Sequence, residues 1–273
     1  MKRLVWSGIG FTFFITAFCI EFYPLINDFW AKARINYSST PIYYTDSNYE
    51  LYLANANIPT DKLYGNCITN GLKCALAVAI AFSSILGRGG HLECFLTVVF
   101  GTIGYELNRQ VIANLAVDGF GTYSIFTFGG FMGLAMGLIL KFKEDRAEGG
   151  STAFHTFNNA SPLSVSYALL GSIIIFALFP ALGYEIDVTN NFNLFNLYIT
   201  PVTIIIGMAA SSIGSVIVSC LFNGNLILRD IIHSPIAGGI VVGSASFFIN
   251  NPVYALVAGF TGGALQSAIQ NLF

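Results

Sequence analysis

The sequence predicts an all-α fold, a polytopic bundle of about eight transmembrane helices, and three observations support this prediction. Charged residues make up only 10% of the 273-residue chain, hydrophobic residues make up 55%, and the mean hydropathy is +0.68. Soluble globular domains carry about 25% charged residues, so this chain lies outside that class. Apolar runs of membrane-crossing length also recur along the chain. The net charge of -2 provides no basic surface, which argues against nucleic acid as a partner.

Eight apolar runs are long enough to cross a bilayer as helices, since about 20 residues span the hydrocarbon core. They cover residues 4–26, 69–87, 92–114, 119–141, 163–183, 194–223, 231–248 and 252–272. The first run follows Met1-Lys-Arg and has no Ala-x-Ala cleavage signal, so we expect a retained anchor rather than a signal peptide. Because no soluble insertion interrupts the helical runs after residue 69, the sequence predicts a single membrane domain of residues 1–273.

A polar stretch after the first run subdivides this domain. Residues 28–66 are rich in tyrosine, contain Pro41 and Pro59, and are too hydrophilic to insert into lipid. We therefore expect residues 1–68 to form an N-terminal anchor helix followed by a Tyr-rich polar loop, and residues 69–273 to form the helical core.

Orientation is predicted from lysine and arginine, which concentrate on the cytoplasmic side of a membrane or the matrix side in a mitochondrion. The side that holds the N-terminus collects Lys2, Arg3, Arg88, Lys141, Lys143, Arg146 and Arg229, whereas the far side has Lys32, Arg34, Lys62 and Arg109. The sequence does not distinguish the plasma membrane from the mitochondrial inner membrane as the location of the chain. Asn36-Tyr-Ser, on the far side, is a glycosylation acceptor if the chain follows the secretory route.

The residue types that carry catalysis or bind metal do not gather in this sequence, so we expect no catalytic site, no metal and no enzyme activity. His91, His155 and His233 have no cysteine or carboxylate partner at metal-ligand spacing. Gly119-Phe-Gly121 lacks the third glycine of a dinucleotide-binding loop.

The cysteines also give no functional signal. Most lie in or beside apolar runs, where cysteine acts as a small hydrophobe; they are Cys19, Cys67, Cys74, Cys94 and Cys220. We expect no cofactor, and structural lipids as the bound molecules.

Ionisable residues inside the predicted spans are better functional candidates, because charge in the membrane is costly. Lys73 and Glu106 stand out. Each also has a structural interpretation. Lys73 lies within about one turn of the outer interface and can extend its ammonium to water. Glu106 and Arg109 are three residues apart on one helical face and can pair.

Small residues four apart predict close helix crossings. Such pairs are Gly133 with Gly137, Gly239 with Gly243, and Gly259 with Gly263. We expect them to pack helices of the same chain against one another rather than to form a dimer face.

The stretch from Asp118 to Gly137 places one acidic residue at the mouth of a long apolar segment, and its neighbourhood resembles a known family. Asn70 with Ala81–Arg88, Asn108 with Asn114, and Asp118 with Gly121 and Thr127–Gly129 resemble the third to fifth helices of the Rh (Rhesus) proteins of the ammonium transporter superfamily. Leu170–Pro180 resembles the helix that opens the second half of those proteins. The clearest match is Asp230–Ala245 followed by Pro252–Phe260. The resemblance covers roughly Asn70 to Gln266.

This resemblance implies two inverted five-helix repeats, usually in a homotrimer, with a narrow apolar pore for ammonia or ammonium in each subunit. The family's pore has an outer acidic residue, two stacked gate phenylalanines and a pair of histidines. Asp118 matches the acidic position, Phe126 stands at the first histidine, and Lys73 and Ile174 stand near the two gate phenylalanines. The helix with the second histidine would follow Phe273, and one span replaces several at the front.

These departures predict a degenerate Rh-like protein, a partial Rh fold without a working ammonium pore. Phe126 offers ammonia no hydrogen bond, and Lys73 at a gate would repel ammonium. Missing helices would also leave polar pore lining facing lipid. We interpret the chain as a structural or accessory subunit of a larger membrane complex, with other membrane subunits and lipids as partners. The alternatives are a channel or transporter for ammonia, ammonium or a small neutral gas, and a family-type homotrimer.

Overall fold

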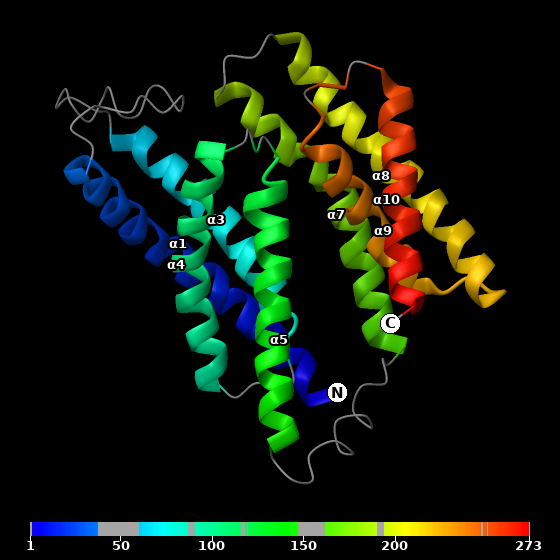
Figure 1. Cartoon of the computed structure of the whole chain (residues 1–273), viewed down its shortest axis with the longest axis horizontal. Coiled ribbons are helices and arrows are strands. Elements are labelled where there is room, and N and C mark those ends of the chain that lie inside the picture. Colours follow the sequence, from blue (N-terminus) through cyan, green and yellow to red (C-terminus); the bar gives the residue numbers. More distant parts are fainter. Residues whose placement is uncertain are drawn as a thin grey trace. The chain divides into compact units, whose positions relative to one another are not determined.

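The computed structural model describes residues 2–37, 60–86, 91–115, 118, 120–146, 162–189, 194–246, 248–249 and 251–272, and most of them are helical. In chain order the helices are α1 (Lys2–Tyr37), α3 (Thr60–Phe82), α4 (His91–Leu115), α5 (Phe128–Arg146), α7 (Pro162–Thr189), α8 (Leu194–Asn223), α9 (Leu228–Gly243) and α10 (Pro252–Leu272) (Figure 1). A π-helical turn, η1 (Thr122–Thr127), leads into α5. No β-strand occurs within the described ranges, and the predicted all-α fold is confirmed.

The predicted spans and the helices agree closely for α8 and α10 and differ at the ends of others. The polar stretch predicted as a loop over residues 28–66 is helical at both ends, because α1 continues to Tyr37 and α3 begins at Thr60. A hydropathy rule finds only the apolar part of a helix. The helical backbone can continue past that part through polar residues that favour helix. The rest of that stretch lies outside the described residues.

Helix α9 is displaced from its predicted run, since it begins three residues earlier than residue 231 and ends at Gly243 rather than 248. Turns replace the helix after Gly243: the Ala245 amide donates to the Val242 carbonyl at 3.1 Å, and the Ser246 hydroxyl donates to the Gly243 carbonyl at 2.7 Å. These bonds satisfy carbonyls that helical bonds would otherwise take. Serines alternate with apolar residues after Gly243, and local bonding by Ser246 accompanies the end of the helix.

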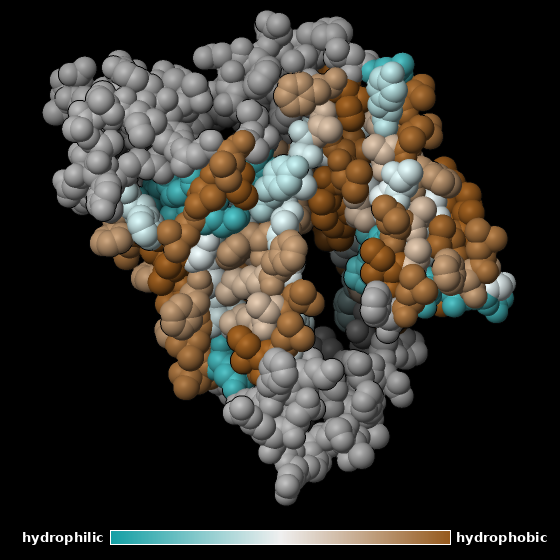
Figure 2. Space-filling model, viewed as in Figure 1, coloured by the Kyte–Doolittle hydropathy of each residue, from teal (hydrophilic) through white to brown (hydrophobic). Residues whose placement is uncertain are grey.

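Three stretches of helix are long and apolar enough to cross a membrane: Gly10–Trp30, Thr122–Leu140 and Ile199–Asn223. Two shorter apolar stretches, Ile68–Phe82 and Val165–Ala181, lie in α3 and α7. On the face shown in Figure 2, hydrophobic side chains cover most of the described surface. Large apolar side chains such as Phe100, Leu138 and Leu178 are half or more exposed to the surroundings. A surface of this kind is suited to lipid or to another membrane protein.

The helices group into two compact units, which are described separately below. Unit 1 comprises residues 1–117 and 123–159, and unit 2 comprises residues 118–122 and 160–273. In unit 1, α1 packs on α3 and α4, and α5 packs on α3. The core of unit 1 centres on fully buried side chains at these crossings, among them Ile15, Cys19, Ala77, Val78 and Val98.

In unit 2, α8 packs most extensively on α10 and α9, and α7 covers α8 and α9. Buried serines on α8 donate to backbone carbonyls of α9. The Ser211 hydroxyl bonds the Ser234 carbonyl at 2.5 Å, and the Ser215 hydroxyl bonds the Asp230 carbonyl at 3.1 Å. Pro235 has no N–H to pair with the Ile231 carbonyl, and the Ser234 hydroxyl donates to that carbonyl instead, at 2.9 Å. Short polar side chains therefore bring α8 and α9 close together.

Candidate functional site

The segment that leads into η1 combines a non-helical backbone with a half-buried acidic residue. Asp118 precedes the turn and is partly buried. The Gly121 amide donates to the Asp118 carbonyl at 3.3 Å, and Gly121 has φ of 74°. This left-handed conformation suits glycine, which has no Cβ to clash. π-Helical turns are rare and occur often at functional sites, so the local geometry by itself marks this segment as a candidate.

Phe120 fixes the start of this segment to unit 2. Its ring is 2% exposed and lies 4.9 Å, centroid to centroid, from the ring of Phe179 on α7. Both rings rest on α9 where it lacks side chains, since a Cβ on Gly243 would overlap Phe120 and a Cβ on Gly239 would overlap Phe179. We call these four residues the Phe120 cluster. The Thr122 hydroxyl also donates to the Ile240 carbonyl at 3.3 Å.

The four residues that the resemblance assigns to pore positions divide between the two units. Lys73 on α3 and Phe126 in η1 belong to unit 1, whereas Asp118 and Ile174 belong to unit 2. Phe126 is partly buried and packs against the hydrophobic core of unit 1. Lys73 is partly buried, and Ile174 on α7 is 50% exposed. The structure therefore shows the ring of Phe126 in apolar packing.

The six glycines predicted to pack helices lie at crossings of different tightness. A Cβ on Gly133 would lie 3.2 Å from the Ala81 Cα of α3, whereas a Cβ on Gly137 would keep 3.9 Å from the Ser84 Cβ. Gly259 and Gly263 of α10 meet the backbone of α8, where a Cβ would overlap carbonyl oxygens of Gly207 and Ser211 respectively. Gly239 and Gly243 support the Phe120 cluster.

A buried ion pair lies on α4 in unit 1. The carboxylate of Glu106 is fully buried and accepts two bonds from the Arg109 guanidinium, at 2.9 Å from Nε and 3.0 Å from Nη2. Gln110 donates to the same carboxylate at 2.6 Å, and Arg109 reaches the side-chain oxygen of Asn27 on α1 at 3.3 Å. We call these four residues the Glu106 network. The pairing predicted from the three-residue spacing is confirmed.

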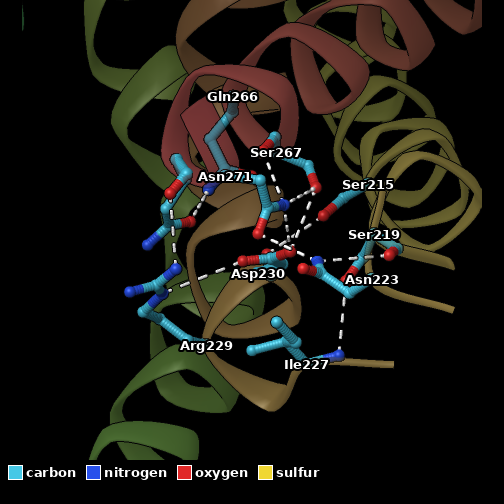
Figure 3. A network of polar contacts seen from close by, with 10 residues as sticks. Ser215, Ser219, Asn223, Ile227, Arg229, Asp230, Gln266, Ser267 and Asn271 are labelled. Atoms are coloured by element: carbon cyan, nitrogen blue, oxygen red, sulfur yellow. Dashed lines mark hydrogen bonds and ion pairs between the residues drawn. The ribbon is translucent and has the colours of Figure 1, made fainter. Parts of the chain in front are cut away.

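A second buried carboxylate, Asp230, lies at the start of α9 in unit 2 (Figure 3). Its Oδ2 accepts bonds from the Ser267 hydroxyl at 3.1 Å and the Asn271 amide at 2.9 Å, both on α10. Asn271 in turn accepts a bond of 2.9 Å from Asn223 at the end of α8. The Asp230 network, made of these four residues, therefore joins the ends of three helices.

The sequence pattern does not predict the Asp230 network. Asp230 lies within a family motif, and its partners on α10 follow 37 and 41 residues later in the chain. The available signal was an acidic residue in the first turn of a helix, where the helix dipole favours negative charge. That signal does not indicate which residues would form hydrogen bonds with Asp230.

Within the described part of the chain, no three histidine, cysteine, aspartate or glutamate side chains gather so that they could hold a metal ion. Cys19, Cys74 and Cys94 are buried free thiols, and Cys220 is exposed. His233 is exposed on α9, and the side chains of His91 and His155 lie outside the described residues. The described carboxylates Glu106 and Asp230 instead form hydrogen bonds within and between helices.

Long apolar helices with lipid-suited surfaces define a class: an all-α, multi-pass integral membrane protein. The sequence model of the Ammonium Transporter Family matches residues 3–272, and the chain belongs to this family. The match begins well before Asn70, where the sequence analysis placed the start of the resemblance, so α1 is part of it. This is a family of membrane transporters rather than of enzymes.

Known relatives agree with the Rh-like resemblance. The chain is 24% identical over 274 residues to ammonium transporter Rh type B of Homo sapiens, covering 98% of this chain and 52% of that one. Rh type C of Tetraodon nigroviridis is 23% identical over 271 residues, covering 98% and 50%. The chain therefore spans about half the length of these relatives.

A solved structure has the same fold. It is that of Nitrosomonas europaea Rh50, of the Rhesus protein family of channels. It superposes with a TM-score of 0.62 at 22% identity over 74% of this chain and 52% of that chain. The prediction of a partial Rh/ammonium-transporter fold is confirmed.

Proposed function

We propose that this chain is a structural or accessory subunit of a larger membrane protein complex and does not conduct ammonium. The observation that carries the proposal is Phe126, which stands at the family's first pore histidine and packs against the apolar core of unit 1. A phenyl ring neither donates nor accepts the hydrogen bonds that a desolvated ammonia or ammonium requires. Lys73 and Ile174 stand near the gate positions, and neither supplies an aromatic ring.

The rest of the family architecture supports a role in assembly. The Phe120 cluster and the glycines of α9 and α10 keep the helices of unit 2 in close contact. Large apolar side chains remain exposed on several helices, as on α7 at Tyr167, Leu170 and Leu178. Other membrane subunits and lipids are the partners that such faces fit. An accessory subunit needs its helix packing for assembly but does not need a pore histidine, and the chain fits this combination.

The second candidate is a channel or transporter for ammonia, ammonium or a small neutral gas. Family membership favours it, as does Asp118, which keeps the acidic position at the start of the pore helix. An apolar gas needs a gap rather than a hydrogen-bonding site, so Phe126 weighs less against gas passage than against ammonium.

Flux through proteoliposomes separates the two candidates. The purified chain, reconstituted with a pH-sensitive dye inside the vesicles, should alkalinise no faster than empty vesicles when ammonia is added outside. The variant Phe126→His should also stay at this background, since one restored imidazole does not restore the gate positions. Ammonia-dependent flux above background in the unmodified chain would overturn the proposal, and a parallel carbon dioxide measurement tests the gas alternative.

Gentle detergent extraction followed by native electrophoresis tests the assembly. We expect the chain to migrate with other membrane polypeptides, which mass spectrometry can name. A stable homotrimer that contains this chain alone would support the channel candidate instead.

A further inference from the structure

A depression at the predicted cytoplasmic or matrix end of unit 2 has the chemistry of a lipid headgroup site. It has a volume of about 620 Å³, opens to the surface, and is lined by Arg229, His233, Gln266, Ile269 and Gln270. The first two residues belong to α9 and the others to α10. We propose that it binds the headgroup of an anionic phospholipid such as phosphatidylglycerol.

The guanidinium of Arg229 supplies the phosphate-binding group. Its side chain is 56% exposed, and its Nε lies 3.9 Å from Oδ1 of buried Asp230, too far for a hydrogen bond. Its Nη2 donates to the Gln270 carbonyl at 3.4 Å, a long bond. The carboxylate of Asp230 therefore lies beside the Arg229 guanidinium without a hydrogen bond to it. Most of the five N–H donors of the guanidinium remain available to a phosphate.

The start of α9 adds further positive potential. The helix begins at Leu228, and the side chain of its N-cap residue, Ile227, cannot cap it. The uncapped amides of the first turn and the helix dipole favour an anion nearby, and they offset the charge of Asp230. His233, one turn later, exposes an imidazole to the same depression.

Gln266 and Gln270 form the polar side of the depression on α10. The Gln266 Nε2 donates to Oε1 of Gln270 at 2.5 Å, and the Gln266 Oε1 is shielded from the surface. The charge that attracts a lipid phosphate to this depression therefore comes from Arg229 and the start of α9.

Apolar side chains beside the depression favour a lipid over free phosphate. Ile269 lines it and is 56% exposed, and Leu265 and Leu272 of the same helix are 63% and 68% exposed. These side chains can contact acyl chains while Arg229 contacts the headgroup. The positive-inside distribution also places Arg229 on the side where membranes are rich in anionic lipid.

Native mass spectrometry of the purified full chain tests the proposal with lipids that share the same acyl chains. Phosphatidylglycerol should bind about fivefold more tightly than phosphatidylcholine, and Arg229→Gln should weaken phosphatidylglycerol binding by about fivefold, the loss of one charge-assisted contact at a half-exposed site. Soluble glycerophosphoglycerol and inorganic phosphate should bind more than tenfold more weakly than the lipid.

The matched control is Arg146→Gln, which removes an arginine at the end of α5 on the same predicted side of the membrane. It should leave phosphatidylglycerol affinity unchanged. Equal binding of the two lipids by the unmodified chain overturns the proposal, as does unchanged affinity in Arg229→Gln. Binding of inorganic phosphate as tight as that of the lipid would show a free-anion site and overturn the lipid assignment. Arg229 is exposed, so its variant should keep the helical circular dichroism of the parent.

Discussion

Glu106 in unit 1 and Asp230 in unit 2 are both completely buried carboxylates, but they are satisfied in different ways. Both oxygens of Glu106 accept bonds, mostly from residues three and four positions further along the same helix. Asp230 accepts through Oδ2 alone, from side chains about 40 residues away, and its Oδ1 has no hydrogen bond. The first carboxylate completes one helix face, whereas the second ties the ends of separate helices together.

This difference determines which carboxylate must carry its charge. Glu106 faces a guanidinium that is mostly buried, and a buried cation without its partner is costly. Asp230 faces neutral donors, with its nearest cation exposed. Replacing each carboxylate with the amide of the same shape therefore separates the two cases.

The largest effect is expected for Glu106→Gln. The amide would place N–H donors against Arg109 or Gln110 and leave the guanidinium without a counter-charge. We expect a loss of about 3 kcal/mol in the free energy of unfolding, measured by detergent-driven unfolding in mixed micelles. The double variant Glu106→Leu with Arg109→Met, which removes both charges, should recover most of this loss. A double variant as unstable as the single one would contradict the ion-pair explanation.

An intermediate effect is expected for Gly263→Ala, which extends the comparison from charges to helix packing. The new Cβ would overlap the backbone oxygen of Ser211, and backbone cannot move aside as a side chain can. α8 and α10 must separate, at a cost of about 2 kcal/mol. Gly137→Ala in unit 1 is the matched control, because its Cβ meets ordinary contact distances. If both variants unfold at the same detergent concentration, the close contact between α8 and α10 does not control the free energy of unfolding.

The smallest effect is expected for Asp230→Asn. Asparagine can keep its oxygen toward Ser267 and Asn271 and turn its NH₂ to the position of Oδ1, which accepts nothing in the parent. The loss should stay below about 1 kcal/mol. Asp230→Ala removes the acceptor of the Ser267 hydroxyl and one bond of the Asn271 amide, which still reaches the Ser267 carbonyl at 2.9 Å. It should therefore cost about 2 kcal/mol in the same assay. Equal losses in the two variants would show that charge, rather than hydrogen bonding, holds this network.

The fold could be predicted largely from local information. Apolar runs located the helices because burying the backbone in lipid requires helical hydrogen bonding over about 20 residues. The Glu106–Arg109 pair was predicted because helical geometry fixes neighbours at three and four residues. Errors arose where another rule applied: α1 extends to Tyr37, beyond its apolar run, and α9 ends early, with the Ser246 hydroxyl bonding the Gly243 carbonyl.

The sites depended on contacts that the local pattern does not encode. Family motifs placed Phe126 at the histidine position, but only the structure shows its ring against the core of unit 1. The Asp230 network and the depression beside it require α9 and α10 to meet at one end, which no residue spacing predicts.

The sequence by itself determined the membrane class, the helical content and the family, because these follow from hydropathy and from motifs that are contiguous in the chain. The tertiary structure decided which carboxylate has an oxygen without a hydrogen bond, which glycines pack against the backbone of another helix, and where Arg229 lines a depression. Those properties arise from side chains of separate helices, and their distances are set only when the helices pack.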